Sequence, residues 1–91
     1  MFNKLKQFKD MRHQASSLQR LLGAETVTIE RQGVTLVVDG NQRVVSLTIP
    51  PTFQTAALER LIPELFNDAT AKVQQLIARK VQAGEITLPQ F

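Results

Sequence analysis

The stretch from Ala56 to Gly84 is the feature that most constrains how this 91-residue chain can fold. Its apolar residues recur at gaps of three and four, the spacing that forms one apolar face on an α-helix. Gly84 is placed to end the helix, because glycine adopts the left-handed conformation without steric cost. At about 1.5 Å per residue the helix is roughly 40 Å long. A globule of this size does not need that length, so we expect part of the helix to project or to pack on another chain.

Pro63 interrupts the helical pattern. A proline inside a helix removes one hydrogen bond and clashes with the preceding turn. Two arrangements are open: a kink at Pro63, or a short helix over residues 56–61 followed by a helix that starts at Pro63. We expect a kinked or stepped helix. Thr52 and Thr55 are candidate N-caps, because threonine hydroxyls accept hydrogen bonds from first-turn N–H groups.

Residues 2–22 carry a second amphipathic pattern, which Gly23 is placed to close. The apolar residues step alternately by three and four, as in the seam of a short coiled coil. We expect this helix to lie along the helix over residues 56–84. The residues of the seam are Phe8, Met11, Ala15, Leu18 and Leu22.

Alternating apolar and polar residues predict three strands, over residues 26–31, 34–39 and 43–49. Gln32-Gly33 predicts the first turn, and Asp39-Gly40-Asn41 predicts a hairpin because these residues tolerate positive φ. Pro50-Pro51 stops the last strand, since proline cannot donate to the ladder. One face of this sheet is aliphatic. The other is mostly Thr and Ser but includes Val37 and Val44, which suggests a partner subunit.

The predicted fold class is therefore α+β, in the order α-β-β-β-α. A three-stranded antiparallel meander is flanked by an N-terminal helix and a long C-terminal amphipathic helix. The chain has no internal repeat or linker, so we expect one domain over residues 1–91, and a dimer.

The composition argues against several kinds of function. The chain has no cysteine, which excludes disulfides and thiolate metal sites and suits a reducing cytoplasm. No apolar run is long enough to predict a membrane span. His13 is the single histidine and has no nucleophile or carboxylate constellation around it, so we expect it to be exposed and not catalytic. We expect no enzyme activity, cofactor, metal or small-molecule substrate.

Positive charge is concentrated near the N-terminus. Residues 1–22 contain five Lys or Arg residues and one Asp, whereas the rest of the chain has a slight acidic excess. At 100° per residue, Lys4 and Lys6 lie about 200° apart and Lys9 and Arg12 about 300° apart. The cations therefore spread around the exposed arc. They can contact phosphates, which need only charge and reach, or they can form an ordinary solvated face.

Four features of the sequence resemble the YbaB/EbfC family of bacterial nucleoid-associated proteins. The chain opens with Met1-Phe2-Asn3-Lys4 and continues into a Gln-, Met- and Lys-rich amphipathic helix. Three short strands end at Ile49-Pro50-Pro51. The following helix contains Phe66-Asn67-Asp68-Ala69, the most specific short match, and the tail ends with Leu88-Pro89-Gln90-Phe91.

The resemblance implies a cytoplasmic, nucleoid-associated homodimer that binds duplex DNA with little sequence preference. Its sheets would form the centre, and the helices of each subunit would project as a tweezer-like pair. We expect DNA contacts from basic residues of both helices and a dimer interface from apolar ones. The expected DNA-binding residues are Lys4, Lys6, Lys9, Arg12, Arg20, Lys72, Arg79 and Lys80, and the expected interface residues are Leu65, Phe66, Val37 and Val44.

Less specific interpretations remain open for the cations of the long helix. Asp68 and Lys72 have the spacing of an ion pair within one helix. Arg79 and Lys80 suit the negative end of the helix dipole. The alternative function is a protein–protein interaction module, in which the helical arm binds another protein and the basic charge is incidental.

Overall fold

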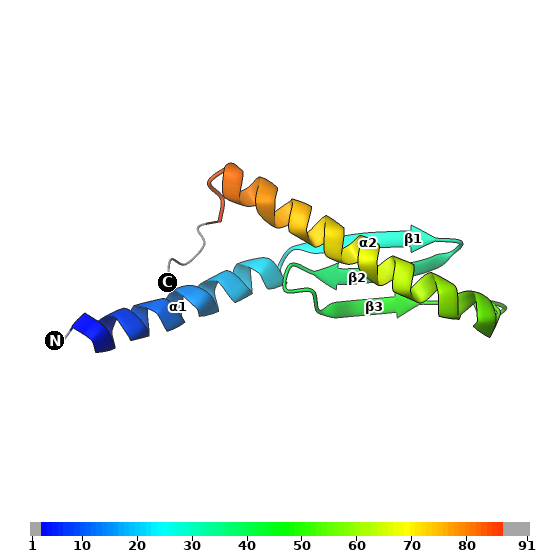
Figure 1. Ribbon diagram of the computed structural model, residues 1–91, viewed down its shortest axis with the longest axis horizontal. Coiled ribbons are helices and arrows are strands. Elements are labelled where there is room, and N and C mark those ends of the chain that lie inside the picture. Colours follow the sequence, from blue (N-terminus) through cyan, green and yellow to red (C-terminus); the bar gives the residue numbers. More distant parts are fainter. Residues whose placement is uncertain (1–2, 87–91) are drawn as a thin grey trace.

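The computed structural model describes residues 3–86, with side chains from residue 5 onward, and has the predicted α+β order. Helix α1 is followed by three strands and the long helix α2 (Figure 1). The strands form one antiparallel sheet in the order β1-β2-β3. The bounds are Asn3–Gly23 for α1, Thr26–Arg31 for β1, Val34–Asp39 for β2, Val44–Thr48 for β3 and Thr55–Gln82 for α2.

The two turns of the sheet are built differently. Between β1 and β2, Gln32 and Gly33 have φ of 53° and 85°, the pair of positive angles that a two-residue hairpin turn requires. Between β2 and β3, the positive φ falls on Gln42, at 62°, and not on the predicted Asp39-Gly40-Asn41. The Asp39 carboxylate closes this loop instead, because its Oδ1 accepts the backbone N–H groups of Asn41 and Arg43 at 2.8 and 3.0 Å.

A β-bulge corrects the predicted faces of the sheet. The register shifts between Val37 and Val38, so that Val37 pairs with Ser46 while Val38 pairs with Val44. Partners in an antiparallel ladder share a face, so Val44 lies on the face of Val38. The prediction that Val37 and Val44 share a face is therefore wrong, because the bulge adds one residue to β3 and breaks the period of two.

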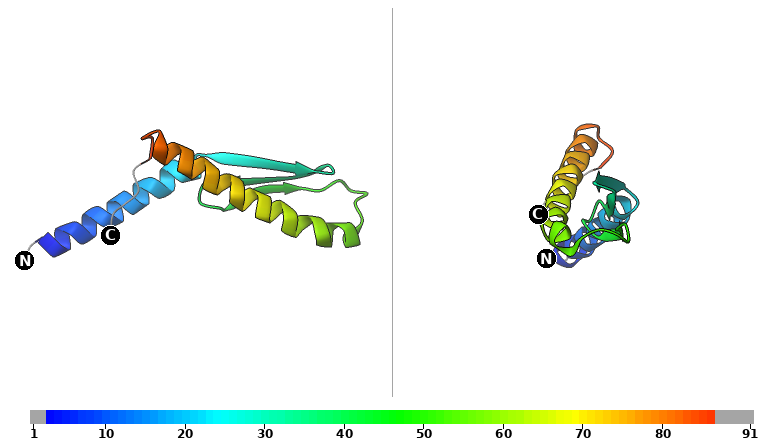
Figure 2. Two further views of the ribbon diagram at one scale, coloured as in Figure 1. Left: turned by 45° about the horizontal axis from the view of Figure 1, so that its top comes forward. Right: turned by 90° about the vertical axis from the view of Figure 1, so that its right-hand side faces the viewer.

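The core lies between α2 and one face of the sheet. Helix α2 crosses β1 and β2 and leaves β3 largely uncovered (Figures 1 and 2). All five residues of β3 are exposed. Inward-facing residues of β1 and β2 meet one stripe of α2, as the two periodicities predict. The buried cluster is Ile29, Val34, Leu36, Val38, Leu61, Leu65, Ala69 and Val73.

Helix α1 does not lie along α2, contrary to the prediction. It leaves the end of the sheet, covers neither face, and packs extensively against no other element within residues 3–86 (Figure 1). The molecule measures 62 × 25 × 18 Å, and its radius of gyration is 17.5 Å. A compact domain of this length has a radius of gyration of about 12 Å. The seam therefore predicted the helix correctly but not its packing partner.

The helix ends confirm some of the predicted capping residues and contradict others. Gly84 has φ of 76° and ends α2 as predicted: the N–H of Glu85 bonds to the carbonyl of Lys80 at 2.9 Å, and the N–H of Gly84 to that of Val81 at 3.1 Å. The predicted threonine N-caps are wrong, since the N-cap position is Gln54 and makes no side-chain capping bond. Gly23 ends α1 but does not adopt a positive φ.

Parts of the segments on which the resemblance rests fall outside the described residues. Phe2 and Leu88-Pro89-Gln90-Phe91 lie beyond residues 3–86. Ile86, the last described residue, is buried. Neither α1 nor α2 contains a segment that is long and apolar enough to cross a lipid bilayer.

Helix α2 runs without interruption through Pro63, so the stepped arrangement is wrong. Pro63 is exposed, and it leaves the carbonyl four residues earlier without an N–H partner. We expect Pro63→Ala to be neutral or to stabilise the protein, by up to about 3 kcal/mol, because alanine restores the hydrogen bond and has the higher helix propensity. Thermal melts of the two proteins measure this, and a loss of several kcal/mol contradicts it.

Candidate nucleic-acid interface

The projecting helix α1 carries an exposed set of cations. Lys6, Lys9 and Arg12 are exposed, and none of them forms an ion pair with a described residue. Lys4 lies in the first turn of the same helix, and Asp10 is the single acidic residue of α1. His13 is exposed, as predicted. Because α1 stands away from the sheet, these charges extend along the outer part of the molecule.

Apolar side chains on α1 are also exposed. Leu5 is 73% exposed and Phe8 59% exposed, whereas Met11 and Leu18 of the predicted seam are half-buried. Among the described side chains of α1, Leu22, at the end that joins the sheet, is the one that is buried. The helix therefore presents cations and an incompletely covered apolar seam together.

The three predicted cations of α2 differ from one another. Lys72 and Arg79 are exposed and have no ion-pair partner in the described part of the chain. Lys80 instead bridges Glu25, at 2.9 Å, and Glu85, at 3.2 Å. Its hydrogen bonds with these carboxylates, that with Glu25 above all, raise the pKa of Lys80. Lys80 thus connects α2 with the segment between α1 and β1.

The predicted ion pair between Asp68 and Lys72 is absent. Asp68 Oδ2 instead lies 2.6 Å from Nη2 of Arg31, whose Nη1 lies 2.8 Å from Glu64 Oε2. Arg31 stands at the end of β1, and the helix that crosses the sheet brings both carboxylates within its reach. A long-range partner has therefore replaced the local one. All three side chains are at least 39% exposed, so the pairs contribute little stability.

The four residues predicted for a dimer interface lie in different environments. Leu65 is 0% exposed and belongs to the core of the single chain. Val37 is half-buried on the face opposite α2. Val44 and Phe66 are 48% and 39% exposed. With Val45 and Leu47 of β3, at 59% and 39%, they form an exposed apolar set that we call the β3 strip: Val44, Val45, Leu47 and Phe66.

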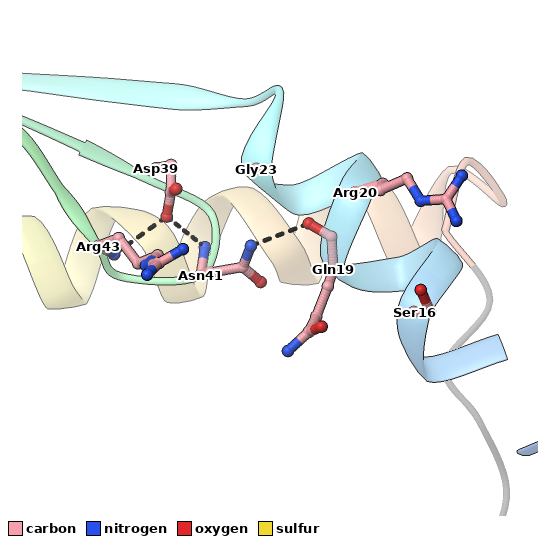
Figure 3. Close-up of a pocket in the computed structure, with 7 residues that line it drawn as sticks. All are labelled: Ser16, Gln19, Arg20, Gly23, Asp39, Asn41 and Arg43. Atoms are coloured by element: carbon pink, nitrogen blue, oxygen red, sulfur yellow. Dashed lines mark hydrogen bonds between the residues drawn. The ribbon is translucent and has the colours of Figure 1, made fainter. Parts of the chain in front are cut away.

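A hollow of about 570 Å³ lies where α1 meets the loop between β2 and β3. Arg20 in the last turn of α1 and Arg43 in the loop both line it (Figure 3). The sequence analysis did not single out Arg43, because it lies in the part of the chain with an acidic excess. Its proximity to Arg20 arises only when the loop folds back on α1. The other lining residues are Ser16, Gln19, Gly23, Asp39 and Asn41.

The described residues offer little for chemistry at a metal or nucleophile. Between residues 3 and 86, no three His, Asp or Glu side chains gather as a metal site would require. Cysteine is missing from the whole sequence. Charged side chains that can contact an anion are the main functional groups on this surface.

The comparisons with known proteins agree with the fold and with the charges. No curated protein is similar enough to the chain to count as a match. The YbaB/EbfC DNA-binding family matches residues 1–85, which is nearly the whole chain. That family is non-enzymatic. The match and the helix–sheet–helix fold together show that this chain belongs to the YbaB/EbfC DNA-binding family.

Proposed function

We propose that the protein binds duplex DNA as a homodimer, through phosphate contacts and with little sequence preference, as a component of the bacterial nucleoid. The observation that supports this most is the projecting α1, whose exposed cations lack acidic partners in the described structure, on a chain of a DNA-binding family. The proposed contacts on α1 are Lys4, Lys6, Lys9, Arg12 and Arg20.

The angular spread of these cations favours phosphate contacts over base reading. Direct reading of bases requires several side chains on one face of a helix that enters the major groove. Lys6, Lys9 and Arg12 follow one another at intervals of about 60° around α1, and Lys4 lies about 80° beyond Arg12, so the four cations span an arc of about 200° and not one face. Long flexible side chains on neighbouring arcs can instead reach phosphates on both sides of a groove. Each contact releases condensed counterions, which gives affinity without sequence information.

The β3 strip supports a homodimer. β3 is an edge strand, and unpaired edges with exposed apolar side chains tend to pair with another chain unless they are protected. Val44 and Leu47 pair with Val38 and Leu36, which face α2, yet both are exposed, and Val45 between them is 59% exposed. Phe66 is 39% exposed and lines a small hollow with Val38, the ladder partner of Val44. A second copy can cover this strip. The dimer then carries two copies of α1 and doubles the number of cations available to one duplex.

The cations of α2 extend the proposed surface unequally. Lys72 and Arg79 are exposed and lack carboxylate partners among residues 5–86, so they are available to phosphates. Lys80 must first leave Glu25 and Glu85. We therefore propose a smaller DNA contribution from Lys80 than from the other two.

The exposed apolar residues of α1 support an alternative function. Leu5, Phe8 and Leu21 are each more than half exposed. A helix with such residues can bind an apolar surface on another protein. In this alternative, α1 is an arm for protein–protein interaction, and its cations serve solubility.

An electrophoretic titration with unrelated duplexes tests the DNA-binding proposal. We expect Lys6→Glu with Lys9→Glu to weaken binding at least about tenfold for every duplex, because both copies of α1 lose phosphate contacts and gain repulsion. Arg60→Glu is the control for local charge reversal, since Arg60 is exposed near the N-terminal end of α2, and that end of the helix lies far from α1 (Figure 1).

The result that contradicts the proposal is specific. If the folded double variant binds DNA as tightly as the wild-type protein, α1 is not the contact surface. If the wild-type protein binds no duplex even at low salt, DNA binding is wrong and the alternative is favoured. Circular dichroism of both variants checks that they are folded.

A further inference from the structure

We propose that the hollow between α1 and the β2–β3 loop is a second phosphate-contact site, in which Arg43 extends the DNA surface from α1 onto the end of the sheet. This inference rests on the proposed function, because the ligand is the backbone of the same duplex. The site would hold DNA phosphates with two guanidinium groups, from Arg20 and Arg43, supported by polar side chains of the hollow.

The two arginines come from separate elements, but both line the same hollow. Arg20 extends from the last turn of α1, and Arg43 from the loop before β3 (Figure 3). Both are exposed, and neither forms an ion pair with any residue whose side chain is described. Arg31, in contrast, is held by two carboxylates. Arg20 and Arg43 therefore keep their hydrogen-bond donors for a ligand.

The hydrogen bond from Asn41 Nδ2 to the carbonyl of Gln19, at 2.9 Å, separates the two arginines. In Figure 3 the Arg43 side chain lies on the loop side of this bond, and Arg20 reaches away on the helix side. The two guanidinium groups thus point to different positions and suit neighbouring phosphates of one strand better than a single free anion. A guanidinium can donate two parallel hydrogen bonds to each phosphate.

Among the described residues that line the hollow, Asp39 is the acidic one, and its carboxylate is directed into the loop. The residue is 8% exposed. Its Oδ1 accepts the N–H groups of Asn41 and Arg43, and hydrogen bonds of this kind partly compensate a carboxylate. The same contact fixes the backbone of Arg43. Asp39 therefore places the arginine without pairing with its guanidinium group.

The junction that positions Arg43 beside α1 is closely packed. The N–H of Gly40 donates to the carbonyl of Leu22 at 2.9 Å, and the Asn41 amide donates to α1 one turn earlier. A Cβ on residue 40 would lie 2.6 Å from the Leu22 carbonyl oxygen, so glycine is required there. The contact with Leu22 satisfies a carbonyl in the last turn of α1 that has no partner within the helix. The two hydrogen bonds hold the loop in place before DNA binds, which lowers the entropic cost of binding.

The test compares Arg43→Ala with Arg60→Ala. Both remove one exposed arginine, but Arg60 does not line the hollow and lies near the N-terminal end of α2, far from α1 (Figure 1). We expect Arg43→Ala to weaken binding to unrelated duplexes equally and to reduce the slope of log K against log salt by about 0.9 per site, or about 1.8 per dimer. Arg60→Ala leaves both quantities unchanged. Arg43→Lys retains most of the slope, because it retains the charge.

Asn41→Ala provides a second test that keeps both arginines. Loss of the amide bond to Gln19 frees the loop from α1, so we expect weaker DNA binding by a folded, dimeric protein. A variant that loses affinity only because it has lost its fold is identified by its circular dichroism spectrum. Unchanged affinity of folded Asn41→Ala contradicts the positioning role of the junction.

The possible results separate this inference from the proposed function. If the wild-type protein binds DNA, the Lys6 and Lys9 variant does not, and Arg43→Ala binds normally, the phosphate site in the hollow is wrong but the proposed function stands. If no protein binds DNA, the proposed function itself fails. A last experiment measures the thermal stability of the wild-type and Arg43→Ala proteins in inorganic phosphate and in chloride at equal ionic strength. Thermal stabilisation that depends on Arg43, without an effect of Arg43 on DNA affinity, identifies a free-anion site and overturns the proposal.

Discussion

Leu65→Asp is expected to unfold the protein, whereas Phe66→Asp is expected to leave the protomer folded and to prevent dimerisation. The two residues are neighbours on α2, but Leu65 is 0% exposed in the core and Phe66 is 39% exposed, near Val38 and Gln42. An unpaired carboxylate in place of Leu65 costs more than about 4 kcal/mol, the range of the most damaging single substitutions. A small domain has only about 5–15 kcal/mol of stability in total.

Sedimentation equilibrium and circular dichroism at micromolar concentration measure the two effects. For the wild-type protein we expect about twice the chain mass of 10.2 kDa. Asn67→Asp is the matched control, because it adds the same charge at the next, exposed position of α2. A wild-type monomer, or a Phe66→Asp protein that remains a dimer, contradicts the role proposed for the β3 strip.

The elements of the fold were predictable because their signals are local. The three- and four-residue spacing of α2 depends only on neighbouring turns, and its stripe includes the buried Leu61, Leu65, Ala69 and Val73. Strand alternation likewise predicted the inward residues of β2, and Gly84 ends α2 as expected. In each case the local sequence determines the secondary structure, whichever element packs against it.

The packing of the elements was less predictable, because it depends on residues far apart in the chain. One additional residue at the bulge places Val44 opposite Val38, and strand alternation cannot reveal such an insertion. The seam of α1 indicates that the helix needs an apolar partner but not which one. In the described chain that partner is not α2.

The candidate site shows the same division between local and long-range information. The exposed cations of α1 follow from the sequence, since they lie between the apolar positions of one helix. Arg43 does not, because only the fold of the β2–β3 loop brings it to the end of α1. Lys80 is the converse case. Its position near the C-terminal end of α2 predicts an unpaired cation, but Glu25, from a distant segment, forms an ion pair with it.

Raising the salt concentration from 50 to 200 mM is expected to weaken DNA binding by a factor on the order of 10²–10⁴. Five basic residues on each α1 and two copies per dimer give roughly four to eight simultaneous phosphate contacts. Each contact contributes about −0.9 to the slope of log K against log salt, so the plot is linear with a slope of roughly −4 to −7. Binding through an apolar surface lacks this steep dependence.

The same titration shows which cations carry the binding. Lys6→Glu with Lys9→Glu removes two contacts from each α1 and so flattens the slope, while Arg60→Glu leaves it unchanged. The affinity falls equally for unrelated duplexes, because phosphates carry no sequence information. A slope near zero in the wild-type protein rules out phosphate neutralisation. If the double variant retains a steep slope, the phosphate contacts lie outside α1, and Lys72 and Arg79 on the exposed side of α2 are the remaining candidates.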